Sequence, residues 1–273
     1  MNDDADVRRA PTLNEAITEV LGKGGVAVLA TLVEAPRGAG AKMLVRSAGS
    51  RTGTLGDPAL DDAVTARALD FLSSRAETST HKIDEFAPAL DRWRGARVMF
   101  ERVEPEPHVV VCGAGHVGAA LARLAASIGY RVTLIDDRAD FVAPARFPEG
   151  RIALVAAAEG WARAVSESVG AGRGVSVAVV TRGHNEDEEC LRAVIDARPD
   201  YVGMIGSRRR TNIVLARLSE SGVAAEQLRE VRAPVGLDIG AVSPEEVALS
   251  ILAEIVARRR GGSCAPLSAW RRA

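Results

Sequence analysis

From residue 108 onward, short apolar segments alternate strictly with helical segments. Five of the apolar segments have strand length and are rich in valine or isoleucine: 109–112, 131–135, 151–155, 175–181 and 201–205. Near-continuous apolar strands separated by helices are typical of a parallel sheet that helices cover on both faces. The sequence therefore predicts an α/β protein whose second domain is a doubly wound, Rossmann-like fold.

The first part of the chain predicts a separate, smaller α+β domain. Its pattern indicates a helix after Thr12, strands at 26–33 and 42–46, a helix from Asp57, and strands around 80–86 and 97–103. Prolines 105 and 107 follow, and because proline cannot continue a strand ladder we place the domain boundary there. The expected domains are 1–104 and 108–260, followed by a C-terminal tail at 261–273.

Composition excludes several classes of partner. With 35 basic and 36 acidic side chains and only 4% aromatic residues, the chain is not expected to bind nucleic acid. No stretch approaches the roughly 20 apolar residues of a membrane helix, and the first residues do not resemble a signal peptide, so we expect no membrane partner and a cytoplasmic location. Three scattered cysteines and four histidines predict no metal site.

Gly113, Gly115 and Gly118 form a GxGxxG loop between the strand at 109–112 and a helix running to about residue 128. Gly113 would permit a tight turn, Gly115 would let backbone amides approach a pyrophosphate, and Gly118 would let helix and strand pack closely. The anion would then rest on the helix N-terminus. The alternative is a structural turn whose nucleotide site is unused. His116, at a variable position, is either a phosphate contact or a tolerated exposed residue.

Asp136 ends the next predicted strand, about 20 residues after the glycine loop. An acidic side chain at this position bonds a ribose hydroxyl in many dinucleotide sites. Asp136 therefore favours a free 2′-hydroxyl, and hence NAD over NADP. Arg138 beside it leaves NADP open as the second choice.

If the five strands are parallel, the loops that follow them meet at one edge of the sheet, where open α/β sheets bind ligands. The fourth strand is followed by Gly183 and His184, and the fifth by Gly206, Ser207 and Arg208. Ser207 fits a helix N-cap, which would leave neighbouring amides free for an anion. These five residues are therefore candidate ligand contacts.

Two interpretations of the 183–188 segment remain open. His184 with Asp187 could act as a proton relay, or Asn185 with Glu188 could form a capping box that needs no ligand. For Asn185 the capping role is favoured. No Tyr-x-x-x-Lys pair or comparable acid/base group for hydride transfer is recognisable.

Several further blocks accompany the glycine loop. In the second domain they are 112–124, 136–138, 183–184, 201–208 and 234–254, and in the first domain 36–45 and 53–56. Together they resemble the XdhC/CoxI family of maturation factors for xanthine and carbon monoxide dehydrogenases, over nearly the whole chain. The chain departs from the family's usual pattern at residues 57–59, where glycines are frequent, and at Arg182, where the family often has a histidine.

The resemblance implies an assembly factor rather than a classical enzyme. Such a factor binds the molybdenum cofactor, helps its sulfuration by a cysteine desulfurase, and delivers it to a xanthine dehydrogenase-type molybdoenzyme. The glycine loop would hold the cofactor's phosphate or pyrophosphate, and Arg37 and Lys42 would face it from the first domain. We also expect a homo-oligomer. The alternatives are an NAD(P)-dependent oxidoreductase of unknown substrate and a nucleotide-sensing regulatory module.

Overall fold

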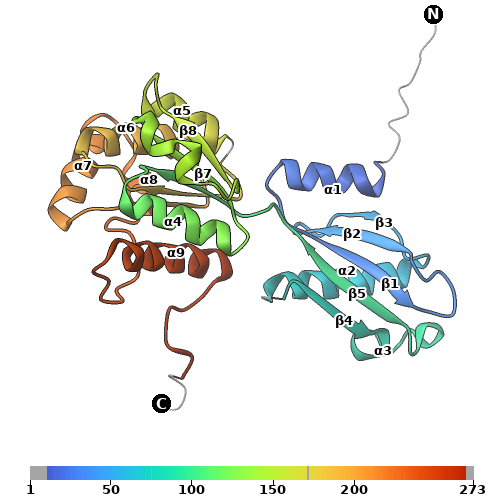
Figure 1. Cartoon of the computed structure of the whole chain (residues 1–273). Helices are drawn as coiled ribbons and strands as arrows, with labels where there is room; N and C mark the ends of the chain where they lie inside the picture. The colour runs from blue at the N-terminus through green and yellow to red at the C-terminus, as the bar shows by residue number, and fades with distance from the viewer. Residues whose placement is uncertain (1–10, 75, 171, 269–273) are drawn as a thin grey trace, which may run out of the picture. The chain divides into compact units, whose positions relative to one another are not determined.

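The computed structural model of the chain describes residues 11–74, 76–170 and 172–268 (Figure 1). Contacts between Cα atoms divide the chain into two compact units, residues 1–105 and 106–273. Each unit has its own sheet and its own hydrophobic core. Within the described residues, no helix combines the length and the apolar character that crossing a membrane requires.

The first unit is built on an antiparallel five-stranded sheet in the order β3-β2-β1-β5-β4. The strands are β1 (Ala27–Glu34), β2 (Lys42–Arg46), β3 (Arg51–Gly53), β4 (Thr78–Lys82) and β5 (Arg97–Val103). The helices are α1 (Leu13–Gly22), α2 (Pro58–Ser73) and the short α3 (Ile83–Phe86), with a 3₁₀ turn η1 (Asp91–Trp93).

The central strand β1 is buried on both faces, which explains its continuous apolar sequence. Successive side chains of a strand point to opposite faces of the sheet. Val28, Ala30 and Leu32 therefore belong to the core that contains α2, whereas Ala27 packs with α1. α2 and α3 therefore contribute to the core on one face of the sheet, and α1 to the core on the other.

The strand predicted at 80–86 is wrong in its second half. β4 ends at Lys82, and α3 begins at Ile83. The Ile83 side chain is fully buried, its N–H donates to the Ala96 carbonyl (2.9 Å), and Asp84 Oδ1 accepts from the N–H of Gly95 (3.0 Å). These contacts with a segment ten or more residues away turn the chain into a helix, and local sequence carries no sign of them. The three-residue strand β3 was also not predicted.

The second unit contains five parallel strands in the order β10-β9-β6-β7-β8. They are β6 (His108–Cys112), β7 (Arg131–Asp136), β8 (Ile152–Ala156), β9 (Val175–Val179) and β10 (Tyr201–Met204). The helices are α4 (His116–Ser127), α5 (Trp161–Val169), α6 (His184–Ile195), α7 (Arg208–Glu220), α8 (Ala225–Glu230) and α9 (Pro244–Arg260), with 3₁₀ turns η2 (Ala139–Val142) and η3 (Pro144–Arg146). The predicted Rossmann-like parallel sheet is confirmed.

Helices cover both faces of this sheet. α4 and α9 pack side by side on one face, and α5, α6 and α7 pack on the other (Figure 1). Alternate residues of β6 face opposite layers: Val109 and Val111 belong to the core with α4 and α9, and Val110 and Cys112 to the core with α5 and α6. Because all five β6 side chains are buried, the strand shows no polar alternation.

His108 is a buried, neutral side chain at the start of β6. It is 4% exposed, and its Nδ1 lies 2.9 Å from Arg131 Nη2, which can only donate. Nε2 therefore carries the proton and donates to Thr133 Oγ1 (2.9 Å). Burial, and then the charge of Arg131, lower the pKa of His108 from its ordinary 6.5 to about 4.

This shift predicts a specific acid sensitivity. Because the folded-state pKa lies below the unfolded-state pKa, protonation favours unfolding, and stability is lost as pH falls from about 6.5 towards 4. Between pH 7 and pH 4, the wild-type chain should lose about 3 kcal/mol more unfolding free energy than His108→Gln does. Urea denaturation of both proteins at the two pH values measures the difference. Equal losses in the two proteins would contradict the prediction.

Candidate functional site

A crevice opens at the carboxyl edge of the parallel sheet, where the strand order changes direction. β6 has β7 on one side and β9 on the other, so the loops after β6 and β9 lead to opposite halves of the sheet. Ligands of open α/β sheets bind at such switch points. A cavity of about 380 Å³ lies here, lined by the loops after β6, β7, β9 and β10 and by the first residues of α5 and α9. A larger cavity of about 560 Å³, beside α8 and the start of β10, shares none of these residues.

The three glycines of the first loop have different physical roles. Gly113 has φ +114°, and a Cβ there would lie 2.6 Å from the Val180 carbonyl oxygen. A Cβ on Gly118 would overlap the carbonyl oxygen of Gly113. A Cβ on Gly115 would meet nothing within 4 Å, and Gly115 lines the cavity. The protein's own packing thus requires Gly113 and Gly118, while Gly115 leaves open space beside the backbone.

The N-terminus of α4 is available to an anion. Gly115 is its N-cap, no side chain caps the helix, and its first turn contains no acidic residue. α6 also has a glycine N-cap, Gly183, but Glu186 and Asp187 lie in its first turn, and the Glu186 carboxylate lies against Gly183. Acidic side chains therefore compensate the positive end of α6, whereas no side chain compensates that of α4.

The Asp136 carboxylate is fully used by the protein. Oδ2 accepts from the N–H of Ala114 (2.7 Å) and from Arg138 Nη2 (2.9 Å), and Oδ1 accepts from Arg138 N (3.0 Å) and Nε (2.8 Å). Asp136 is 1% exposed, and four donors fill the capacity of a carboxylate. The expected bond from Asp136 to a ribose hydroxyl stays a prediction, and it would require one of these four bonds to break.

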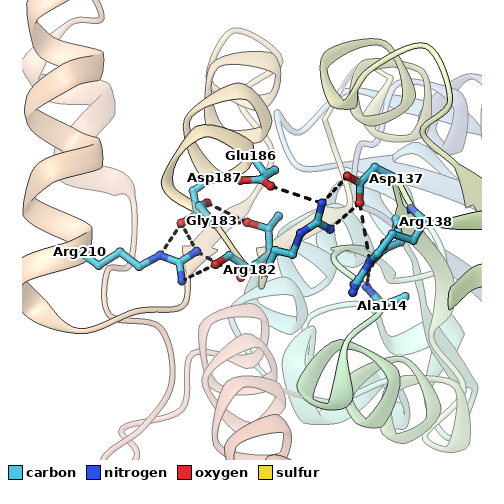
Figure 2. Close-up of polar contacts among 10 residues, drawn as sticks. Ala114, Asp137, Arg138, Arg182, Gly183, Glu186, Asp187 and Arg210 are labelled. Atoms are coloured by element: carbon cyan, nitrogen blue, oxygen red, sulfur yellow. Dashed lines mark hydrogen bonds and ion pairs between the residues drawn. The ribbon is translucent and has the colours of Figure 1, made fainter.

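Arg182 connects the loop after β9 to the loop after β7. Its Nη1 and Nη2 each donate to one oxygen of Asp137 at 2.8 Å, and Glu186 lies 3.6 Å away on the other side (Figure 2). These bonds with Arg182 lower the pKa of Asp137 to about 2. Arg182 lines the cavity, whereas Asp137 is not among the lining residues.

A second ion pair lies beneath the same loop. Asp187, fully buried, accepts from Thr181 Oγ1 (2.5 Å) and from Arg210 Nε (2.8 Å) and Nη2 (2.5 Å). Arg210 Nη2 also donates to the Thr181 carbonyl (3.2 Å), so it holds the end of β9 to the start of α7 (Figure 2). Burial raises the pKa of Asp187. The hydrogen bonds from Thr181 and Arg210 act in the opposite direction but do not cancel this increase.

The structure places the predicted site residues in different ways. Gly113, Gly115, His116, Asp136 and Gly206 line the cavity, and Gly118 packs beneath it. Ser207 is the predicted N-cap of α7 and accepts from Arg210 N (3.2 Å). Gly183 is the N-cap of α6, and His184 and Arg208 begin α6 and α7 outside the lining. Arg37 and Lys42 are exposed in the first unit, where Lys42 Nζ donates to Thr31 Oγ1 (2.9 Å). Their roles toward a ligand stay predictions.

The capping box expected at Asn185 is wrong. Gly183 occupies the N-cap position, so Asn185 is the second residue of the helix, and its Oδ1 accepts from Arg217 (3.3 Å). Asp187 is committed to Thr181 and Arg210, and no hydrogen bond joins it to His184 among the described residues. The geometry therefore gives no support to the proton relay.

Several residues of the lining were not among the predicted site residues; those with aromatic or polar side chains are Arg138, Trp161, Thr181, Arg182 and Arg210. One sequence signal could have identified Arg210. If Ser207 is the N-cap, the third helical residue is Arg210, which lies near the sheet edge with the cap. Within the described ranges, no group of three or more histidine, cysteine or acidic residues could hold a metal ion.

Comparisons with known proteins found a matching family model for each unit of the chain. Residues 109–255 match the family model described as the XdhC Rossmann domain, and residues 20–84 match the model of the XdhC and CoxI family. An uncharacterized protein of Escherichia coli K12, YqeB, is 34% identical over 220 residues, which cover 79% of this chain and 40% of YqeB. A Bacillus subtilis protein named as a probable component of xanthine dehydrogenase is 30% identical over 163 residues, or 60% of this chain and 46% of the relative. The chain thus spans less than half the length of these two relatives.

Two further comparisons extend over nearly the whole chain. The molybdenum cofactor insertion chaperone PaoD of Escherichia coli K12 is 27% identical over 94% of this chain and 92% of its own length. A crystal structure described as a xanthine dehydrogenase from Bacillus halodurans covers 94% of this chain and 98% of its own, with a TM-score of 0.50 and 17% identity. At this level of identity the second match supports the fold alone.

Proposed function

Because the chain belongs to the XdhC/CoxI family, we propose that it is a carrier that binds the molybdenum cofactor and delivers it to a xanthine dehydrogenase-type molybdoenzyme. The observation that carries the proposal is the start of α4, where an uncapped helix N-terminus meets open space beside Gly115. The full-length similarity to the insertion chaperone PaoD supports the same role.

The crevice fits the phosphate-bearing end of such a cofactor. Pterin cofactors carry a phosphate or a pyrophosphate, and backbone N–H groups at a helix N-terminus bind such anions without a positive side chain. Gly113, Gly115 and His116 line the position that the phosphate would take. The cofactor, when bound, supplies the molybdenum chemistry of the client, and the residues of this chain bind and orient it.

The polar groups of the crevice are arranged for holding a ligand. Asp136, Asp137 and Asp187 are each paired with an arginine, so these carboxylates are poor candidates for a general base. This arrangement favours a carrier over an NAD(P)-dependent oxidoreductase, which would use the same glycine loop. The proposal includes a cysteine desulfurase as the partner that sulfurates the cofactor, a cytoplasmic location, and self-association of the chain.

Deletion of the gene tests the proposed role. The client hydroxylase should still fold and contain its other redox centres, but it should be low in active, sulfurated cofactor. The same measurement is repeated with the gene restored. Normal client activity in the deletion strain, together with NAD(P)-dependent turnover of a small substrate by the purified chain, would favour the oxidoreductase instead.

Gly115→Val tests the phosphate site itself. The added side chain would occupy the open space at the start of α4, so the affinity for the cofactor should fall at least tenfold while stability changes little. Mass spectrometry of copurified pterin and titration of the purified chain with cofactor measure the loss. Gly22→Val is the matched control, because a Cβ there also meets nothing within 4 Å, at the end of α1. Unchanged cofactor binding by Gly115→Val would contradict the proposed site.

A further inference from the structure

We propose that the β7 end of the crevice selects a ligand that carries a phosphate there, over the same ligand with a free hydroxyl, and that Arg138 determines this specificity. The inference rests on the proposed phosphate-binding role of the glycine loop and concerns the part of a bound ligand that reaches the loop after β7. It reverses the preference for NAD that Asp136 suggested from sequence alone.

The Asp136 carboxylate has no hydrogen-bond capacity left for a ligand hydroxyl. A ribose diol is recognised by a carboxylate with free lone pairs. Asp136, which stands at the position of that carboxylate, is 1% exposed and accepts four hydrogen bonds from Ala114 and Arg138. It therefore offers no free acceptor to a hydroxyl in this structure.

The Arg138 guanidinium keeps donor capacity that faces the cavity. The Arg138 guanidinium uses Nε and Nη2 on Asp136 and lies over the Phe141 ring, with Cζ 3.5 Å from the ring centroid. These contacts fix its plane, yet the side chain remains 36% exposed and lines the cavity. Nη1 makes no hydrogen bond with the described residues, so the N–H groups of Nη1 remain free to donate to a ligand.

A second guanidinium lies near the first. Asp137 Oδ1 is 2.8 Å from Arg182 Nη1 and 3.9 Å from Arg138 Nε, so the two arginines flank one carboxylate oxygen. Arg182 lines the cavity as well, and Asp137 holds it there without being part of the lining. Asp137 is thus a positioning residue for Arg182.

The side chains offered to a ligand at this end are therefore preorganised cations. A phosphate accepts charge-assisted, often bidentate bonds from guanidinium groups, whereas a hydroxyl gains much less from them. A 2′-phosphorylated adenosine ligand with its 5′-phosphate at α4 carries one phosphate for the helix N-terminus and one for the arginines, which line the same cavity.

Calorimetry on the full chain tests the inference with four probes: adenosine 5′-monophosphate, adenosine 2′,5′-bisphosphate, NAD⁺ and NADP⁺. Adenosine 2′,5′-bisphosphate should bind at least tenfold more tightly than adenosine 5′-monophosphate, and NADP⁺ at least tenfold more tightly than NAD⁺. Arg138→Gln should reduce this ratio to about one with little effect on adenosine 5′-monophosphate, and Arg138→Lys should retain part of it. Arg123→Gln is the matched control, because that guanidinium also lies over a phenylalanine ring but outside the cavity.

The outcomes separate the inference from the proposed function. Equal affinities within each pair, or a ratio that Arg138→Gln leaves intact, overturn the inference and leave the glycine-loop site standing. If none of the four probes binds, both the inference and the nucleotide-type site are overturned. Thermal unfolding of each variant shows whether the variant chain is folded. If Arg138→Gln fails to fold, Phe141→Leu, which removes the ring under the guanidinium, should lower the ratio instead, and an unchanged ratio there also overturns the inference.

Discussion

Gly118→Ala should lower the unfolding free energy by about 3 kcal/mol, although alanine is the better helix former. Gly118 lies in the first turn of α4, and a Cβ there would overlap the backbone carbonyl of Gly113 and approach the Val180 side chain to 3.1 Å. Because the main obstacle is backbone, the helix has to move away from the sheet. Helix propensity alone predicts a gain of about 1 kcal/mol, so the two arguments differ in sign.

Urea denaturation of the full chain, followed by far-UV circular dichroism, measures the effect. Gly115→Ala is the matched control, since it is three residues away, has φ −65° and gains no contact within 4 Å. Its stability should stay within about 0.5 kcal/mol of wild type. A Gly118→Ala protein as stable as wild type would show that α4 and β6 do not need the close approach.

Asp187→Ala should cost about 3–5 kcal/mol of unfolding free energy. Asp187 is fully buried and is the counter-charge of Arg210, which is 21% exposed. Removing the carboxylate leaves the guanidinium without its charge partner and leaves Thr181 Oγ1 with only its longer hydrogen bond, to the Gly183 carbonyl (3.2 Å). The penalty comes from the groups left behind, because desolvating a charge is costly when no partner compensates it.

A double variant separates this cause from a simple loss of packing. Asp187→Leu combined with Arg210→Met removes both charges and should recover most of the stability that Asp187→Ala loses. Glu188→Ala is the comparison for an exposed ion pair with Arg192, and its cost should stay below about 1 kcal/mol. Chemical denaturation of all three proteins measures these differences. A double variant as unstable as Asp187→Ala would contradict the explanation.

The sequence and structure agree most closely where local pattern and tertiary packing favour the same conformation. The parallel sheet was predictable because β6, buried on both faces, shows an uninterrupted apolar run. The glycine loop was predictable because Gly113 and Gly118 satisfy a steric requirement between neighbouring segments. The family resemblance, based on blocks in both halves of the chain, is confirmed by the matches at 20–84 and 109–255.

The differences arise where distant residues decide. Ile83–Phe86 is helical because of contacts with residues 95 and 96. Asn185 does not begin a capping box because Gly183 is the N-cap, one position before His184. In both cases the local sequence is compatible with two conformations, and packing selects between them.

The sequence by itself determined the fold class, the glycine loop and the family, because each depends on periodicity or on short motifs. Only the tertiary structure decided which charged groups of the crevice remain available. Arg138 donates hydrogen bonds to the carboxylate of Asp136, two residues earlier in the sequence. Arg182 donates to Asp137, which is 45 residues away in the sequence. Which hydrogen bonds a side chain makes depends on the neighbours that folding brings to it. Asp136, which in the sequence predicts a ribose contact, therefore binds Arg138 in the folded protein.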